Sequence, residues 1–356
     1  MNLWIAPSKK CTTRVFLSGD LKTTSSFLFQ IRRALPITLK HLTFKKLFNA
    51  SVCLFEMVTK RSVLHSDPLY LRIEVCPYCN LRCPGCMLGG TRKVSESNPE
   101  HRLEGAMKYI LFEESLRDFA PSLFRVWLYD EGEPLLNGEI YDMIHFLSTN
   151  NVGTCVSTNF SLKFSDETIG KIADCGLEHL IVALDGSTQE SYSRYRRGGD
   201  FNLVVSNIRR LQSLLSKKKS SPLKIEIQFL EFEYNKEERE AMRKLAKELG
   251  VWRLTIMEGC SCGADEESRP DLPEDERRDK RCYEIWLGAT INSIGELGTC
   301  DYGEDFGIPN IGFAKDYKSE GLRNHPAIIQ LRKSFGDNSV PLNDICKQCH
   351  WTIKKR

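Results

Sequence analysis

Four cysteines, Cys76, Cys79, Cys83 and Cys86, lie within the stretch IEVCPYCNLRCPGCM. In a reducing compartment, thiols this close together more often bind metal than form disulfides. Two zinc knuckles usually lie roughly a dozen residues apart, but only three residues separate Cys79 from Cys83. A ferredoxin run would need another thiol where Arg82 stands. The triad Cys79, Cys83 and Cys86 fits best, because three thiolates on a 4Fe-4S cluster leave one iron open to a substrate or cofactor.

A second group of thiols lies near the end of the chain, and its members are Cys282, Cys300, Cys346 and Cys349. Residues 282–356 contain too few large apolar side chains for an independent core, so we expect a metal site to hold this segment. Four thiols suit either a second iron-sulfur cluster or a zinc ribbon.

The elements that would position these residues begin near residue 70, where short apolar runs alternate with helical stretches. Six strands, each followed by a crossover, predict a parallel sheet with its active site at the carboxyl ends of the strands. The predicted fold is α/β, an open partial (β/α)6 TIM-like barrel with a small C-terminal iron-sulfur domain and a helical N-terminal extension. The predicted strands are 70–75, 124–129, 152–157, 177–185, 223–232 and 251–257.

Composition divides the chain into a helical extension (1–68), the barrel (69–260), a charged, proline-containing linker (261–281) and the small domain (282–356). Within the extension, apolar residues from Leu39 to Phe48 recur at helical spacing among lysines. A basic amphipathic helix of this kind could rest on a membrane surface, but packing on the barrel is the interpretation we adopt.

Bulk composition narrows the class of protein. The 356 residues include 50 basic and 47 acidic ones, so no chain-wide positive field predicts a nucleic acid partner. The sequence shows neither a secretory signal nor an apolar run of about eighteen residues that could span a bilayer. We therefore expect a cytoplasmic enzyme.

The motif CNLRCPGC from Cys79 to Cys86 resembles the Cys-x3-Cys-x-Φ-Cys signature of the radical SAM superfamily, although Gly85 replaces the usual aromatic residue. This resemblance implies a site-differentiated 4Fe-4S cluster that binds S-adenosylmethionine. It also places Cys76 outside the cluster, as a small buried residue.

Later segments add to the resemblance. YDEGEPLLN is similar to the family's Gly-Gly-Glu-Pro segment, so Gly132, Glu133 and Pro134 would accept hydrogen bonds from the methionyl ammonium. STNF after the third strand implies cofactor contacts from Ser157 and Asn159.

The region after the fourth strand resembles that of the SPASM and Twitch subgroup, in which an arginine before a glycine pairs with the cofactor carboxylate. Arg197 fits this description. Gln228 alternates with apolar neighbours and could point into the barrel toward cofactor or substrate. Asp185, at a strand tip, could face the substrate or cap the next helix.

The resemblance implies reductive cleavage of S-adenosylmethionine to a 5′-deoxyadenosyl radical, which abstracts a substrate hydrogen atom. We expect a small polar metabolite, such as a sugar or aminocyclitol, to be oxidised, with Asp185 or Glu258 as base and a flavodoxin or ferredoxin as electron donor. Cys260 and Cys262 could ligate a cluster, donate a hydrogen atom or have no role.

The C-terminal cysteines are similar to those of a Twitch domain, the short form of SPASM, which holds one auxiliary 4Fe-4S cluster. Two alternatives stay open: a SPASM-type enzyme that cross-links or epimerises a peptide, and an iron-sulfur scaffold or electron carrier without radical chemistry.

Overall fold

The computed structural model describes a set of residues that includes most of the predicted barrel; the full set is 15–17, 39–84, 86, 88, 105–218, 221–259, 282–298, 300, 310–337, 339–342 and 346. Three cysteines with predicted roles lie outside these residues: Cys349, a predicted auxiliary ligand, and Cys260 and Cys262, the possible hydrogen-atom donors. In the described part of the chain, no helix is long and apolar enough to cross a membrane.

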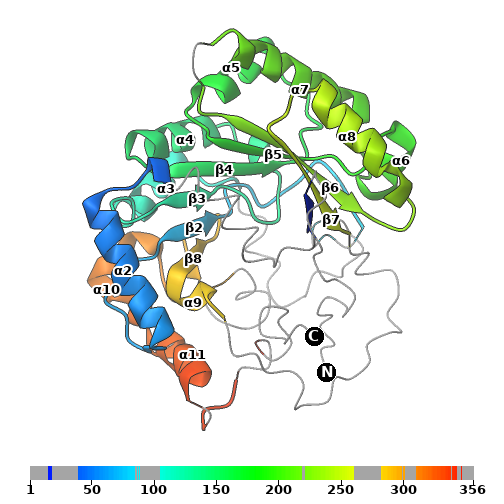
Figure 1. The fold of residues 1–356 in the computed structure, drawn as a ribbon. Helices are drawn as coiled ribbons and strands as arrows, with labels where there is room; N and C mark the ends of the chain where they lie inside the picture. The colour runs from blue at the N-terminus through cyan, green and yellow to red at the C-terminus, as the bar shows by residue number, and fades with distance from the viewer. Residues whose placement is uncertain are drawn as a thin grey trace.

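A nine-stranded sheet runs through the molecule in the order β1-β7-β6-β5-β4-β3-β2-β8-β9. Strands β2 to β7 are parallel neighbours in chain order, as the predicted (β/α)6 barrel requires, and the sheet stays open (Figure 1). The strands are β1 (Val15–Leu17), β2 (Tyr70–Ile73), β3 (Arg125–Trp127), β4 (Gly153–Thr158), β5 (His179–Ala183), β6 (Lys224–Glu231), β7 (Arg253–Glu258), β8 (Gly288–Ile291) and β9 (Leu297–Gly298).

Helices α3 to α8 cover the outer face of these strands (Figure 1). Three of these helices begin at side-chain caps: Ser165 caps α5, Thr188 forms a capping box with Ser191 at α6, and Asp200 caps α7. The helices are α2 (Phe44–Val58), α3 (Tyr109–Leu116), α4 (Ile140–Thr149), α5 (Asp166–Asp174), α6 (Gln189–Tyr195), α7 (Phe201–Ser216), α8 (Arg239–Glu248), α9 (Glu284–Leu287), α10 (Tyr317–Glu320) and α11 (Pro326–Gly336).

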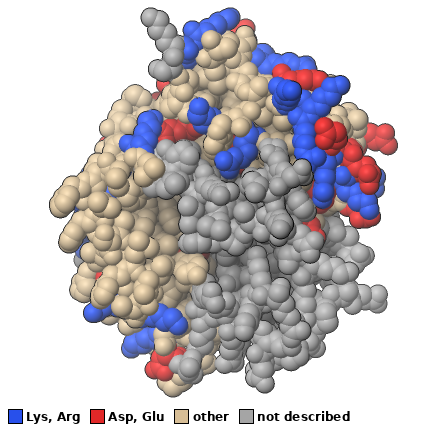
Figure 2. All heavy atoms as spheres, viewed as in Figure 1, with Lys and Arg blue, Asp and Glu red and all other residues tan. Residues whose placement is uncertain are grey.

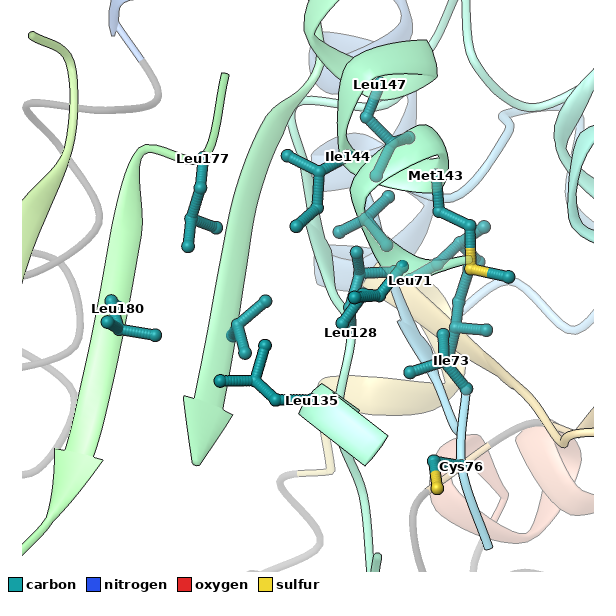
Figure 3. Close-up of a cluster of buried hydrophobic side chains, with 14 of the residues drawn as sticks. Leu71, Ile73, Cys76, Leu128, Leu135, Met143, Ile144, Leu147, Leu177 and Leu180 are labelled. Carbon is teal, nitrogen blue, oxygen red and sulfur yellow. The ribbon is translucent and has the colours of Figure 1, made fainter. Parts of the chain in front are cut away.

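The main core lies between the sheet and these outer helices. Figure 3 shows Leu71 and Ile73 of β2 beside side chains of α4 such as Met143 and Ile144. All four are at most 1% exposed, and each large aliphatic side chain buried in this way contributes about 1.5–3 kcal/mol. The same core holds Cys76, which confirms the prediction that this cysteine is a small buried residue.

The opposite face of the strands carries a buried polar chain across three strands. Arg125 Nη2 lies 2.7 Å from His179 Nδ1, and His179 Nε2 lies 2.9 Å from Glu226 Oε2. A guanidinium can only donate, so the Arg125 contact requires Nδ1 as the acceptor, and Glu226 can then accept from Nε2. The ring thereby links the positive charge of Arg125 to the negative charge of Glu226.

Two strands from outside the predicted barrel extend the sheet. β1, within the extension that we predicted to be helical, pairs antiparallel with β7, and β8 of the C-terminal segment pairs parallel with β2. An open barrel leaves two edge strands with unpaired backbone groups, and added strands satisfy those groups. An exclusively helical extension is therefore wrong, because Val15–Leu17 forms a strand.

The C-terminal segment also shares the barrel's core. Ile285, Trp286 and Phe335 are at most 3% exposed and belong to the same apolar cluster as the barrel strands. Burial against the barrel supplies the core that the composition of this segment lacks. The described part of residues 282–346 thus packs without depending on metal alone, contrary to the expectation from its sequence.

Candidate active site

The loop that carries Cys79, Cys83 and Cys86 follows β2 directly. Cys83 is buried, whereas Cys79 and Cys86 are half-buried. Burial is the main cause that raises the pKa of the Cys79 thiol to about 11; the negative charges of Glu133, Cys83 and Cys86 contribute to this rise, and the Leu81 amide opposes it. A bound cation would favour the thiolate forms that a cluster requires.

This loop fits a 4Fe-4S cluster in its donor chemistry. The Leu81 amide nitrogen lies 3.4 Å from Cys79 Sγ, and Asn159 Nδ2 lies 3.7 Å from the same sulfur. Such N–H groups stabilise the negative sulfur atoms of a cluster. In the parts of the chain that the structure describes, no three His, Cys, Asp or Glu side chains gather around a single-ion site. A cubane requires a wider spacing, because each thiolate binds a different iron atom.

The segment after β3 lies directly against this loop. The Glu133 amide donates to the Tyr78 carbonyl at 2.9 Å. A Cβ atom added at Gly132 would lie 1.8 Å from the Cys76 carbonyl oxygen, so only glycine fits there. The GEP segment is therefore held in backbone contact with the stretch that leads into Cys79.

The Glu133 carboxylate joins the tip of β3 to the tip of β4. It accepts hydrogen bonds from Thr158 Oγ1 at 2.6 Å, the Asn159 amide at 2.7 Å and the Leu135 amide at 3.1 Å. Burial raises the pKa of Glu133 to about 6, and these three donors oppose that rise. Pro134 is also buried and begins a short 3-10 helix, Pro134–Leu136. The side chain of Glu133 thus holds the segment after β3 against the end of β4.

Asn159, which we predicted to contact the cofactor, lies beside the cysteine loop. Its Nδ2 donates to Asn80 Oδ1 at 2.9 Å, and its Oδ1 accepts from the Ser161 amide at 2.8 Å. The next residue, Phe160, has φ +55°, a conformation rare for a large side chain and typical of functional sites. The other predicted residue of this strand, Ser157, is half-buried.

Arg196, which the sequence analysis missed, reaches the cluster loop. Its Nη1 lies 3.9 Å from Cys83 Sγ, and its Nε donates to Asp185 Oδ2 at 2.5 Å. The predicted residue, Arg197, is exposed, and its carbonyl accepts from the Arg82 amide at 3.0 Å. The sequence offered two adjacent arginines, Arg196 and Arg197, as candidates for this role. The end of α6 at Tyr195 decides which arginine turns inward.

Asp185 is fully buried, and it does not cap the helix that follows. The helix that follows is capped by Thr188, so the capping alternative is wrong. Its Oδ1 accepts from the Leu230 amide at 2.7 Å, and Oδ2 is held by Arg196. Burial raises the pKa of Asp185, and the charge of Arg196 opposes the rise. Both oxygen atoms are thus engaged within the chain.

The remaining predicted residues lie on other elements. Gln228 and Glu258 are half-buried on β6 and β7. Cys282 and Cys300 are half-buried and pack against the core, while Cys346 is buried within it. Three of the four predicted auxiliary ligands therefore lie against one core.

An open parallel barrel with a three-cysteine loop after its first barrel strand defines the class as radical SAM. The sequence profile of the Radical SAM superfamily matches residues 73–245. Residues 73–245, just under half of the chain, therefore form a radical SAM domain.

Relatives of established name match mainly this domain. A GTP 3′,8-cyclase of Limosilactobacillus fermentum is 26% identical over 149 residues, 42% of this chain and 43% of that protein. A GTP 3′,8-cyclase of Agrobacterium fabrum is 27% identical over 241 residues, 63% of this chain and 62% of that protein. The chain thus spans less than half the length of the first of these relatives.

A solved structure shares the fold over a longer range. Streptococcus suis SuiB, crystallised with S-adenosylmethionine, matches with a TM-score of 0.57 and 14% identity, covering 92% of this chain and 82% of SuiB. At this identity the likeness shows the fold alone.

Proposed function

We propose that Cys79, Cys83 and Cys86 hold a 4Fe-4S cluster whose open iron binds S-adenosylmethionine. When bound, this pair supplies the reductive cleavage that yields a 5′-deoxyadenosyl radical, which removes a hydrogen atom from the substrate. The observation that carries the proposal is the hydrogen-bonded web around the loop: Tyr78 to Glu133, Asn159 to Asn80, and Arg196 beside Cys83. An electron carrier without radical chemistry would not need polar anchors from the tips of β3 and β4 and from the end of α6.

Each anchor has a separate task in this proposal. The backbone at Gly132 and Glu133 accepts hydrogen bonds from the methionyl ammonium, because the Glu133 carboxylate is already bonded within the chain. Arg196, rather than Arg197, pairs with the methionyl carboxylate, because it is the arginine beside Cys83. Ser157 and Gln228 face the remainder of the cofactor from β4 and β6.

For the reaction itself, we propose a two-electron oxidation of a small polar metabolite. After the hydrogen atom is removed, the substrate radical would lose its remaining electron to an auxiliary 4Fe-4S cluster on Cys282, Cys300, Cys346 and Cys349. A flavodoxin or ferredoxin would supply the separate electron that reduces the cluster on Cys79, Cys83 and Cys86. Glu258 is the better candidate base, since both oxygen atoms of Asp185 are engaged.

Two other outcomes have support of their own. SuiB has also been crystallised with its precursor peptide SuiA, which favours a peptide substrate for this fold. The relatives named GTP 3′,8-cyclase favour a nucleotide substrate and a cyclisation. In a redox-neutral reaction, Cys260 or Cys262 could return a hydrogen atom to the substrate.

The first test measures cofactor cleavage without any substrate. Anaerobically reconstituted protein is mixed with S-adenosylmethionine and dithionite, and 5′-deoxyadenosine is quantified. We expect product from the unaltered chain and from Cys76→Ala, and none from Cys79→Ala, Cys83→Ala or Cys86→Ala. Loss of product in Cys76→Ala, with product kept in one of the other three, would overturn the ligand assignment. Absence of product from every protein that binds iron would favour the electron carrier.

A further inference from the structure

Helix α2 presents large apolar side chains to solvent. Thirteen large hydrophobic residues are exposed in the described part of the chain, and nine of them lie between Leu39 and Val63. On α2 itself they recur at spacings of three, four and seven, so they share one face of the helix. We call this face the outer stripe; its residues are Phe44, Leu47, Phe48, Leu54, Phe55 and Val58.

The side chains of the outer stripe are largely exposed to solvent. Phe44 is 86% exposed, Phe48 66% and Val58 74%. In Figure 1, α2 lies on the left flank of the molecule, and this flank in Figure 2 shows few charged side chains. Large contiguous apolar patches are rare on soluble monomers and mark interaction sites.

The inward face of α2 is polar, the reverse of an ordinary surface helix. Lys46 is 2% exposed and its Nζ donates to the Asn151 carbonyl at 2.5 Å. The Glu56 carboxylate accepts from Ser66 Oγ at 2.6 Å and from the His65 amide at 2.6 Å. These bonds fix the rotation of α2 about its axis, so the apolar residues cannot turn inward without leaving buried charges unpaired. Helix α2 thus packs on the rest of the chain through this inward face, while the apolar residues at helical spacing point to solvent.

The exposed charges of this segment are basic. Lys45, Lys60 and Arg61 are exposed, as is Lys40, whose ammonium pairs with the Glu178 carboxylate. Glu56, the one acidic residue between Leu39 and Val63, is buried and bonded inward. An apolar stripe with a basic border matches an anionic lipid surface, in which the side chains enter the acyl boundary and the basic groups meet the phosphates.

We infer that α2 is an interfacial helix that docks the protein on anionic lipid bilayers, lying flat with its outer stripe inserted. A second copy of this chain is the less favourable occupant. Two outer stripes in a symmetric contact would bring their basic borders together, and like charges would oppose the contact. The inference goes beyond the proposed chemistry and does not depend on it.

The test measures sedimentation of the full, reconstituted chain with vesicles. We expect binding to phosphatidylcholine vesicles that contain phosphatidylglycerol, and weak binding to phosphatidylcholine alone. Phe48→Glu together with Phe55→Glu should lower the partition coefficient by roughly tenfold or more, because charged groups would enter the interface. Lys45→Gln together with Arg61→Gln should lower it by about thirtyfold, since each basic group near the surface contributes about 1 kcal/mol.

Matched controls lie on α8, where Ala241, Lys244 and Lys247 are exposed. Ala241→Glu, and Lys244→Gln with Lys247→Gln, should leave the partition coefficient within about twofold of the unaltered chain. All substituted residues are exposed, so an unchanged melting temperature verifies folding. The inference is overturned if the chain ignores anionic vesicles or if the α2 and α8 variants bind alike. It is also overturned if the chain instead forms a dimer that Phe48→Glu dissociates.

Discussion

Arg196 Nε donates to Asp185 Oδ2 at 2.5 Å, from the end of α6 to the tip of β5. Asp185 is fully buried, and its other oxygen accepts from the Leu230 amide. The carboxylate is therefore fixed, and it fixes one edge of the guanidinium while the other edge lies near Cys83. This arrangement makes Asp185 a positioning residue for Arg196.

The first prediction follows from this pair. Arg196→Lys should raise the dissociation constant of S-adenosylmethionine by roughly ten- to a hundredfold, because an ammonium cannot bridge a carboxylate in the bidentate way. Asp185→Asn should raise it by about tenfold through loss of a charge-assisted bond. Equilibrium binding to the reconstituted protein measures both. Arg197→Lys is the matched control and should bind normally; weakened binding in this variant alone would restore the original assignment.

A second prediction concerns the brace between β3 and β4. Glu133→Gln leaves one acceptor oxygen where the carboxylate has two, so either Thr158 Oγ1, which bonds Oε1, or the Asn159 amide, which bonds Oε2, loses its acceptor. The cysteine loop should lose its alignment, and 5′-deoxyadenosine formation should fall by at least about tenfold. Nearby Glu139 bonds the Tyr109 amide at 2.7 Å on the outer side. Glu139→Gln should retain nearly full activity, and equal losses in the two variants would refute a specific brace.

The barrel was predictable because each strand gives a short apolar run and each helix a capped, periodic one. The cysteine triad was predictable because its spacing is local. Arg196 was not, because the choice between two adjacent arginines depends on where α6 ends in three dimensions. The orientation of α2 was missed for a related reason: the buried partners of Lys46 and Glu56 are tertiary contacts that helical periodicity does not reveal.

A third prediction tests how α2 is anchored. Burial lowers the pKa of Lys46 from 10.5 to about 8. The unfolded chain therefore binds more protons than the folded one between about pH 8 and 10.5, so this lysine costs stability at pH 7 and the cost fades across that window. Lys46→Met should raise the apparent melting temperature at pH 7 by a few degrees, about 2 kcal/mol after loss of the bond to Asn151.

The control for this prediction is Lys45→Met, at the exposed neighbouring position. Its melting temperature should follow that of the unaltered chain at every pH. A gain from Lys46→Met that persisted undiminished at pH 10.5 would show that the buried charge is not its cause.

The fourth prediction concerns the auxiliary site. Reconstituted protein should bind about eight iron atoms, and Cys282→Ala with Cys300→Ala should bind about four. Because Trp286 and Phe335 share the barrel's core, we expect the circular dichroism of this variant to stay close to that of the unaltered chain. Zinc with about four iron atoms in the unaltered chain would instead support the zinc ribbon.

The central claim is that the cluster on Cys79, Cys83 and Cys86 has an open iron that S-adenosylmethionine occupies. Electron-nuclear double resonance on the dithionite-reduced protein, with S-adenosylmethionine labelled with nitrogen-15 at its amine, tests this claim most directly. We predict a nitrogen coupling to the cluster in the unaltered chain and in the variant that lacks Cys282 and Cys300, which keeps only this cluster. A reduced cluster on the triad with no coupling to the labelled amine would contradict the account.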